Sequence, residues 1–215
     1  ILCNIRYKGF KTIKLPMTFS ITSDTSPMGE GSDYSHAGED LRNALEKLCK
    51  DAEAAVDEGF NYIILTDKVS DPLSPWNGEG DEAFIPSLLA VSAVHHHLIS
   101  VGKRVQTALI VESGEIREVM HAALLLGYGA SALCPYMTYA VLDDLVKQGK
   151  IQEEYATAEA HYIKAVDKGL KKIMSKMGIS TIRSYRGAKI FESIGLSEDL
   201  LRRYFGTEVS TIGGI

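Results

Sequence analysis

The stretch Ile85–Tyr136 constrains the fold most, because its apolar residues recur first with a helical and then with an extended period. Pro86 occupies a position suited to the first residue of a helix. An N–H at that position has no partner within the helix, so the N–H that proline lacks is not missed. Apolar residues then recur every three or four positions as far as Ile99, and Gly102 marks the end of this predicted helix. The β-branched run Val105–Val111 that follows predicts a short strand.

The same alternation repeats in the second half of this stretch. Residues 112–115 form a polar turn, and the almost wholly apolar segment behind it predicts a second helix that Gly127 and Gly129 close. Ser131–Cys134 is the next predicted strand. A strand, a helix and a strand joined by such short turns form a βαβ unit, so we expect a parallel sheet covered by helices.

The rest of the chain continues this pattern. Further strands are predicted at Ile13–Phe19, Tyr62–Leu65 and Ile179–Ile182, and further helices at Leu41–Val56, Tyr139–Lys147, Glu154–Lys176, Gly187–Ile194 and Ser197–Tyr204. Pro16 places the first strand near a sheet edge or bulge, and the longest helix is expected to bury a stripe that runs from Tyr155 to Met177. The βα unit recurs about five times, too few for a closed eight-stranded barrel. A partial, TIM-barrel-like sheet and an open parallel sheet both fit these residues.

The composition is that of an ordinary globular protein, with 45% hydrophobic and 24% charged residues among 215. The net charge of −5 argues against a nucleic-acid partner. No apolar run is long enough to span a membrane, and no secretory signal is recognised. The cysteines lack metal-like spacing; Cys49 and Cys134 are expected to be small core residues, and so few cysteines suit a reducing, cytoplasmic compartment. We expect one domain over residues 1–215, either complete or cut from a longer polypeptide.

The run His95-His96-His97 suggests a metal site at first sight. Successive helical residues point about 100° apart, so three neighbouring imidazoles do not converge on one ion. A helical pair of ligands needs a spacing of four residues, which no pair of histidines here supplies. We therefore interpret these histidines as packed or surface residues, and we predict no metal site, no cofactor site and no catalytic residue in this chain.

Two polar segments are weak candidates for a ligand site or an interdomain site, because each follows a predicted strand. Glu112 and Ser113 follow one strand, at the end where α/β folds place their ligands. Glu112 would act there as a base or an anchor, or would simply pair with a neighbouring loop, while Glu115 favours the dipole of the next helix. Ser184 and Arg186 follow another strand and open a helix, where N–H groups and a guanidinium would hold a phosphate. Since no glycine-rich phosphate loop is present, we favour a structural ion pair for Arg186.

The segment 68–83 is irregular, acidic and rich in proline and glycine. It holds Trp76, the one tryptophan of the chain. Leaving an indole in water costs on the order of 2 kcal/mol relative to burying it, so we expect Trp76 to dock. The surrounding acids favour a neighbouring domain or subunit over the chain's own surface. Our hypothesis is that Trp76 is exposed in the isolated chain and buried in the full-length protein; a blue-shifted emission that acrylamide does not quench in the isolated chain would refute it.

Several long motifs resemble the central domain of the large chain of glutamate synthase. They are IPSLLAVSAVHHHLI, VESGEIREV, LLLGYGASALCPY and KAVDKGLKKIMSKMGISTIRSYRGAKIFESIGL, followed in the same order by RRYF and IGGI. The central domain of that family is related to a barrel, so the resemblance favours the partial TIM-like barrel. The segment 68–83 departs from the family, since it is longer than the matching turn.

The resemblance implies a non-catalytic domain that joins a glutamine amidotransferase domain to a synthase domain and helps form an internal ammonia channel. The parent enzyme would make glutamate from glutamine and 2-oxoglutarate, with electrons from a reduced pyridine nucleotide or ferredoxin, in the cytoplasm or a plastid. Its FMN and its iron–sulfur cluster are expected outside this region. The alternative is a free-standing small barrel-type enzyme that binds a phosphorylated or flavin ligand at Glu112, Ser184 and Arg186.

Overall fold

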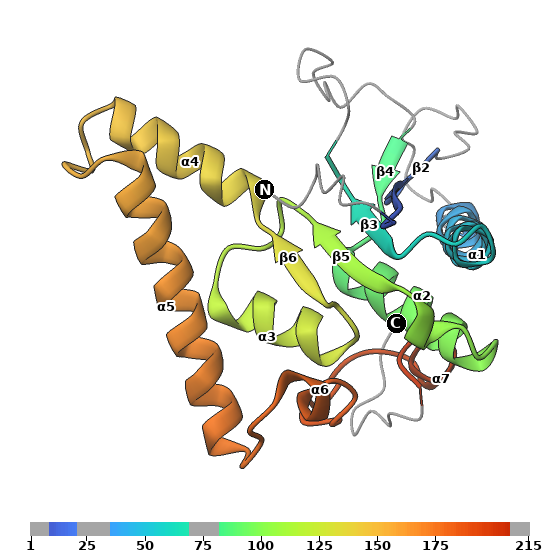
Figure 1. Ribbon diagram of the computed structural model, residues 1–215. Helices are drawn as coiled ribbons and strands as arrows, with labels where there is room; N and C mark the ends of the chain where they lie inside the picture. The colour runs from blue at the N-terminus through green and yellow to red at the C-terminus, as the bar shows by residue number, and fades with distance from the viewer. Residues whose placement is uncertain (1–8, 21–34, 69–81, 207–215) are drawn as a thin grey trace.

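A computed structural model describes residues 9–20, 35–68 and 82–206 of the chain (Figure 1). The strands are β1 (Thr12–Pro16), β2 (Thr18–Ser20), β3 (Tyr62–Thr66), β4 (Glu82–Phe84), β5 (Ala108–Glu112) and β6 (Ala132–Cys134). The helices are α1 (Ser35–Asp57), α2 (Ser87–Ser100), α3 (Val119–Gly127), α4 (Tyr136–Lys147), α5 (Tyr155–Lys176), α6 (Ile182–Tyr185) and α7 (Glu198–Tyr204). None of the helices within these described ranges is long and apolar enough to cross a membrane.

Four strands form one parallel sheet in the order β1-β3-β5-β6 (Figure 1). Consecutive strands of this sheet are neighbours, as in a barrel, whereas a doubly wound sheet reverses its order partway. The connections carry α1, α2 and α3 in turn, and β2 pairs with β4 in a separate antiparallel sheet. The prediction of parallel βα units in a partial, TIM-barrel-like sheet covered by helices is therefore confirmed.

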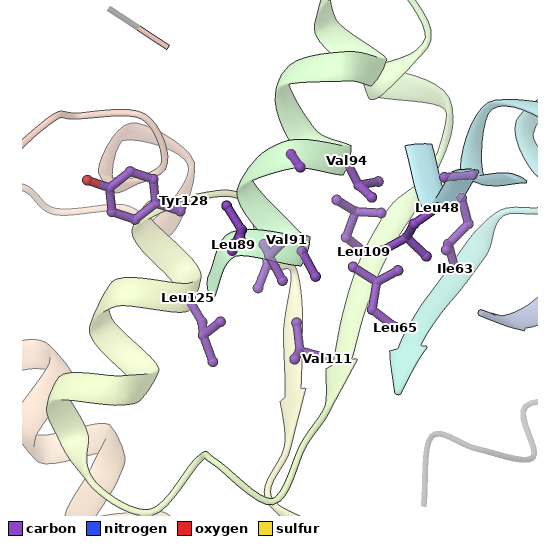
Figure 2. Packing of buried hydrophobic residues seen from close by; sticks show 14 of the residues in the cluster. Leu48, Ile63, Leu65, Leu89, Val91, Val94, Leu109, Val111, Leu125 and Tyr128 are labelled. Atoms are coloured by element: carbon purple, nitrogen blue, oxygen red, sulfur yellow. The ribbon is translucent and has the colours of Figure 1, made fainter. Parts of the chain in front are cut away.

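The core lies between one face of this sheet and the helices. Side chains alternate between the two faces along a strand, and Leu65 of β3 with Leu109 and Val111 of β5 points to the helix-covered face. Figure 2 shows Val91 and Val94 of α2 lying over these strand residues, all of them fully or almost fully buried. Burial of each such side chain contributes roughly 1.5–3 kcal/mol.

Helix α2 is apolar on nearly every side because other elements surround it. It packs on α1, α3, α7 and the strands β3 and β5, and a helix buried all round needs no polar face. Gly102, with φ of +70°, ends the helix as predicted. Pro86 is the residue before the first helical residue rather than the first one itself, since its ψ of 129° is extended.

Two predicted strands differ in the structure. The strand predicted at Ile13–Phe19 is split at Met17, whose N–H donates to the carbonyl of Thr66 while its own carbonyl accepts from Ile85, so its two halves pair with different partners. β1 is an edge strand, as Pro16 indicated. The strand predicted from Val105 begins only at Ala108, because Arg104–Gln106 forms a 3-10 turn that leaves Val105 95% exposed.

Two predictions are wrong: the strand at Ile179–Ile182 and the helix at Gly187–Ile194. The Thr181 hydroxyl accepts a hydrogen bond from the N–H of Ser184 and starts the short helix α6 where a strand was expected. The range Gly187–Ile194 is not helical, because Gly187 and Lys189 have φ of +72° and +53°, which a right-handed helix does not allow. Apolar side chains in this segment, such as Phe191, pack on the core without regular backbone structure.

Other boundaries shift in smaller ways. α1 begins at Ser35 instead of Leu41, and α4 begins at Tyr136 instead of Tyr139. α5 matches its predicted range, but Met177 beyond its end is 52% exposed although it was predicted to be inside. Most of the segment 68–83, with Trp76, lies outside the described residues; its last two residues belong to β4.

Candidate functional site

The carboxyl ends of the parallel strands meet at one edge of the sheet. Thr66 lies beside Glu112 in the register of β3 and β5, and Glu112 beside Cys134 in that of β5 and β6. Parallel α/β folds place their ligands at this edge. The polar residues here form what we call the strand-end cluster: Lys14, Thr66, Asp67, Glu112, Ser113 and Tyr136.

Glu112 is 3% exposed and paired within the sheet. Its carboxylate accepts a hydrogen bond from Lys14 Nζ at 2.8 Å and one from the hydroxyl of Thr66 at 2.8 Å. The three residues come from β1, β5 and β3 and share the sheet face opposite the helices, because side chains alternate along each strand. A buried carboxylate needs such partners, since an unpaired buried charge is costly. The Lys14 side chain is 47% exposed, so only the carboxylate half of this ion pair is buried. The partners lie on the strands β1 and β3, where the sequence had suggested a loop.

Ser113 is fully buried and connects the end of β5 to the end of β3. Its hydroxyl donates to the Asp67 carboxylate and accepts from the N–H of Glu115 at 3.1 Å. The N–H of Gly114 also donates to Asp67, at 3.1 Å. These bonds hold the turn after β5 against the turn after β3.

Tyr136 closes the cluster from the start of α4. Burial, the charge of Asp67 and the hydrogen bond that the phenol donates to Asp67 raise the pKa of Tyr136 to about 12. The ammonium of Lys68 lies 5.4 Å from the centre of the Tyr136 ring. The phenol is therefore held neutral at ordinary pH, as a hydrogen-bond donor to a carboxylate.

The bonding of the strand-end cluster suits a rigid joint better than a reaction centre. A nucleophilic serine needs a base that takes its proton, most often an imidazole, and within the described residues no imidazole bonds to Ser113. The oxygens of Asp67 are occupied by three donors from Ser113, Gly114 and Tyr136. Glu115 completes the joint differently from expectation: it accepts from the N–H of Ser87 at 2.8 Å and so caps α2 rather than α3.

The other two candidates, Ser184 and Arg186, lie at the opposite end of the sheet. Arg186 donates to the carbonyl of Ala130 at 3.1 Å and to the hydroxyl of Ser131 at 3.4 Å, just before β6 begins. Ser184 is exposed and bonds to Thr181 within α6. The structure thus does not bring these two residues together with Glu112 and Ser113, and Arg186 binds a carbonyl where an ion pair was expected.

A second polar cluster, which sequence reasoning missed, lies beside Arg186. Arg104 Nε donates to His95 Nδ1 at 2.8 Å, and its two terminal nitrogens donate to the carbonyls of Thr107 and Gly129 at 2.8 and 2.7 Å. Burial and the charge of Arg104 lower the pKa of His95 to about 3, so this imidazole stays neutral. Burial, with the charge of Arg186, lowers the pKa of Arg104 to about 10.

Gly129 makes this arrangement possible. Its φ is +127°, and a Cβ placed on it would lie 2.5 Å from Cγ of His95. The ring therefore packs directly on the glycine backbone, and Arg104 reaches the carbonyl of the same residue.

The three histidines have separate partners. His96 Nδ1 lies 2.8 Å from the carbonyl of Ser92, and His97 Nε2 lies 2.8 Å from the Glu53 carboxylate. Across the described ranges, no group of three or more histidine, cysteine or acidic side chains is placed to hold a metal ion.

Comparison with known proteins identifies the family. The family model described as "Glutamate synthase central domain" matches residues 1–197. This chain belongs to that family. The match covers the sheet, the strand-end cluster and the cluster around His95.

The central domain is also similar to curated proteins. It is 46% identical to the glutamate synthase [NADPH] large chain of Bacillus subtilis over 178 residues, which are 82% of this chain and 11% of that protein. It is 42% identical to ferredoxin-dependent glutamate synthase 2 of Synechocystis, over 81% of this chain and 12% of that protein. It is 40% identical to the glutamate synthase [NADH] of Schizosaccharomyces pombe, over 80% and 8%. The chain thus spans about a tenth of the length of these relatives.

The His95 cluster of this central domain carried only a faint signal in the sequence. His95 and Arg104 lie nine positions apart, and Gly129 lies a further 25 positions along the chain. A glycine two residues after another glycine at a helix end indicated a turn, but not that an imidazole packs on it.

Proposed function

We propose that this chain is a non-catalytic domain of a glutamate synthase, which joins the glutamine amidotransferase domain to the FMN- and iron–sulfur-containing synthase domain. In that role it helps form the channel through which ammonia passes, in the synthesis of glutamate from glutamine and 2-oxoglutarate. The observation that carries the proposal is the family match over residues 1–197, together with a strand-end cluster whose polar groups bind one another.

Within the described ranges, the residues do not fit the cofactors that the family implies. An iron–sulfur cluster needs cysteine thiolates converging from one site, whereas Cys49 is buried on α1 and Cys134 ends β6. A flavin phosphate suits a helix N-terminus with unbonded N–H groups, whereas the Ser87 N–H at the start of α2 is bonded to Glu115. These observations support the proposal that FMN and the cluster belong to other domains of the parent chain.

The alternative of a free-standing enzyme fits these observations less well. It needs Glu112, Ser184 and Arg186 around one ligand, and they lie at opposite ends of the sheet. The matched residues also make up only 11%, 8% and 12% of the length of these three relatives.

The relatives differ in their electron donors and in their location. The relatives are named for NADPH, NADH and ferredoxin, so the electron donor is unassigned. A cytoplasmic or plastid location is proposed, the latter because a chloroplastic relative from spinach is 40% identical. The apolar helix residues 122–126, which suit a channel wall by composition, pack in the core of the described fold, so we assign the lining of the channel to no residue.

The proposal is tested in the full-length enzyme with Glu112→Gln and Ser113→Ala, and with Lys172→Ala, an exposed position, as the control. Glutamine-dependent and ammonia-dependent glutamate formation are measured beside the melting temperature. We expect both activities to stay within about threefold, because loss of a general acid or base costs about 100-fold or more. A loss of that size with an unchanged melting temperature would show that the strand-end cluster takes part in the reaction.

A further inference from the structure

Helix α4 is apolar but buries none of its residues. Eight of its twelve residues are aliphatic or aromatic, yet none is buried. Among the described elements, α4 packs mainly on α5, which itself runs back along α3 (Figure 1). A helix in this setting is expected to be polar on its free side, so its composition points to contact beyond α5.

The two sides of α4 differ in their contacts. On the inner side, the Thr138 hydroxyl donates to the carbonyl of Ile116 at 2.9 Å, and the Tyr139 ring meets that of Tyr162 edge-on with centroids 6.1 Å apart. On the outer side, Met137 and Val141 are 47% and 50% exposed. They are four residues apart and therefore lie one above the other on the same face.

The charged groups beside this face already have partners. The Asp143 carboxylate pairs with Lys147, and Asp144 accepts from the side-chain amide of Gln148 at 2.6 Å. A partner that covers Met137 and Val141 therefore contacts an apolar surface. The acids beside this surface, Asp143 and Asp144, are already bonded to residues one turn further along the helix.

The size of the face indicates which occupant it suits. A twelve-residue helix is about 18 Å long and its outer face about 10 Å wide, so it offers about 180 Å². A stable contact between separate proteins needs about 800 Å² from each partner. A face this small suits a contact between parts of one polypeptide, where the covalent link supplies a high effective concentration.

We propose that the outer face of α4, around Met137 and Val141, docks against an apolar patch on another domain of the same polypeptide. This rests on the proposed function, in which the chain works inside a much longer glutamate synthase; about nine-tenths of the length of the relatives lies outside the matched region. The contact fixes α4, whose first residue, Tyr136, belongs to the strand-end cluster.

The test places a photo-crosslinking benzoylphenylalanine at position 141 of the full-length protein, with position 105, a 95% exposed valine, as the matched control. Mixed light and heavy isotope-labelled chains separate links within one chain from links between copies. We expect position 141, but not position 105, to link to one peptide of the same chain outside residues 1–215. If the first variant fails to fold, position 137 on the same face replaces it.

Links from 141 that stay within residues 1–215, links to a second copy, or the absence of links would each overturn the proposal. A second readout is the melting temperature of the full-length protein, which Val141→Asp should lower while Val105→Asp leaves it unchanged. Neither readout uses activity, so failure of this contact leaves the non-catalytic role intact. Conversely, a catalytic effect of the Glu112 and Ser113 variants would leave the contact intact.

Discussion

Replacing Gly129 with alanine tests how tightly the His95 cluster is built. A side chain at φ of +127° is strained, which costs of order 1–3 kcal/mol. Its Cβ would also lie 2.5 to 2.7 Å from three atoms of His95, so the imidazole must move. Moving the ring breaks the bond from Arg104 and leaves a buried donor unsatisfied, which costs about 1–3 kcal/mol more. We therefore expect Gly129→Ala to lower the free energy of unfolding by roughly 2–6 kcal/mol.

Gly102→Ala is the matched control for the strain alone. Gly102 also has a positive φ, +70°, but a Cβ there meets nothing within 4 Å, so the change should cost only about 1–2 kcal/mol. Both variants are compared with the parent by urea unfolding. In a protein of this size each kcal/mol lowers the melting temperature by about 2–4 °C, so calorimetry gives an independent measure.

A double-mutant cycle isolates the close approach of the two residues. In a His95→Gly background both the ring and its Cβ are gone, so Gly129→Ala should then cost only the backbone strain, about 1–3 kcal/mol. Our account of the packing would be refuted if Gly129→Ala and Gly102→Ala were equally costly, or if removal of the ring left the cost at 129 unchanged.

Three further predictions follow from burial and charge. Leu45→Ala should cost roughly 2–5 kcal/mol through a cavity, since Leu45 is 1% exposed; Lys172→Ala, on the solvent side of α5, should cost less than roughly 0.5 kcal/mol in the same urea melts, and equal costs would contradict the face assignment. His95 titrates near 6.5 when unfolded but at about 3 in the fold, so stability should decline as pH falls from 6.5 toward 3, by at most about 1.4 kcal/mol per unit; His95→Asn should remove this component, and an unchanged pH profile would count against a buried neutral imidazole. Burial raises the pKa of Cys49 to about 11, so a maleimide should label the less buried Cys134 before Cys49, and rapid labelling of Cys49 in the folded protein would disprove its burial.

The sequence by itself determined the elements whose partners are close along the chain. The βαβ unit in Ile85–Tyr136 and the sequential sheet follow from local periodicity and from glycines at helix ends, because one helix can only cover the strands on either side of it. The α/β class and the buried strands β3 and β5 were predictable in this way. The family resemblance added the expected function and the preference for a barrel-like fold, which periodicity does not indicate.

Only the tertiary structure decided where the polar candidates lie. The pattern of Ile179–Ile182 allows a strand, but in the fold Thr181 starts a short helix and the segment packs on the core instead of extending the sheet. That one difference moves Ser184 and Arg186 away from Glu112. The pairing of Lys14 with Glu112, and of Arg104 with His95 over Gly129, joins residues from different elements. Their own neighbours in sequence carry no trace of those contacts, because burial and hydrogen bonding are settled by what packs against a residue in space.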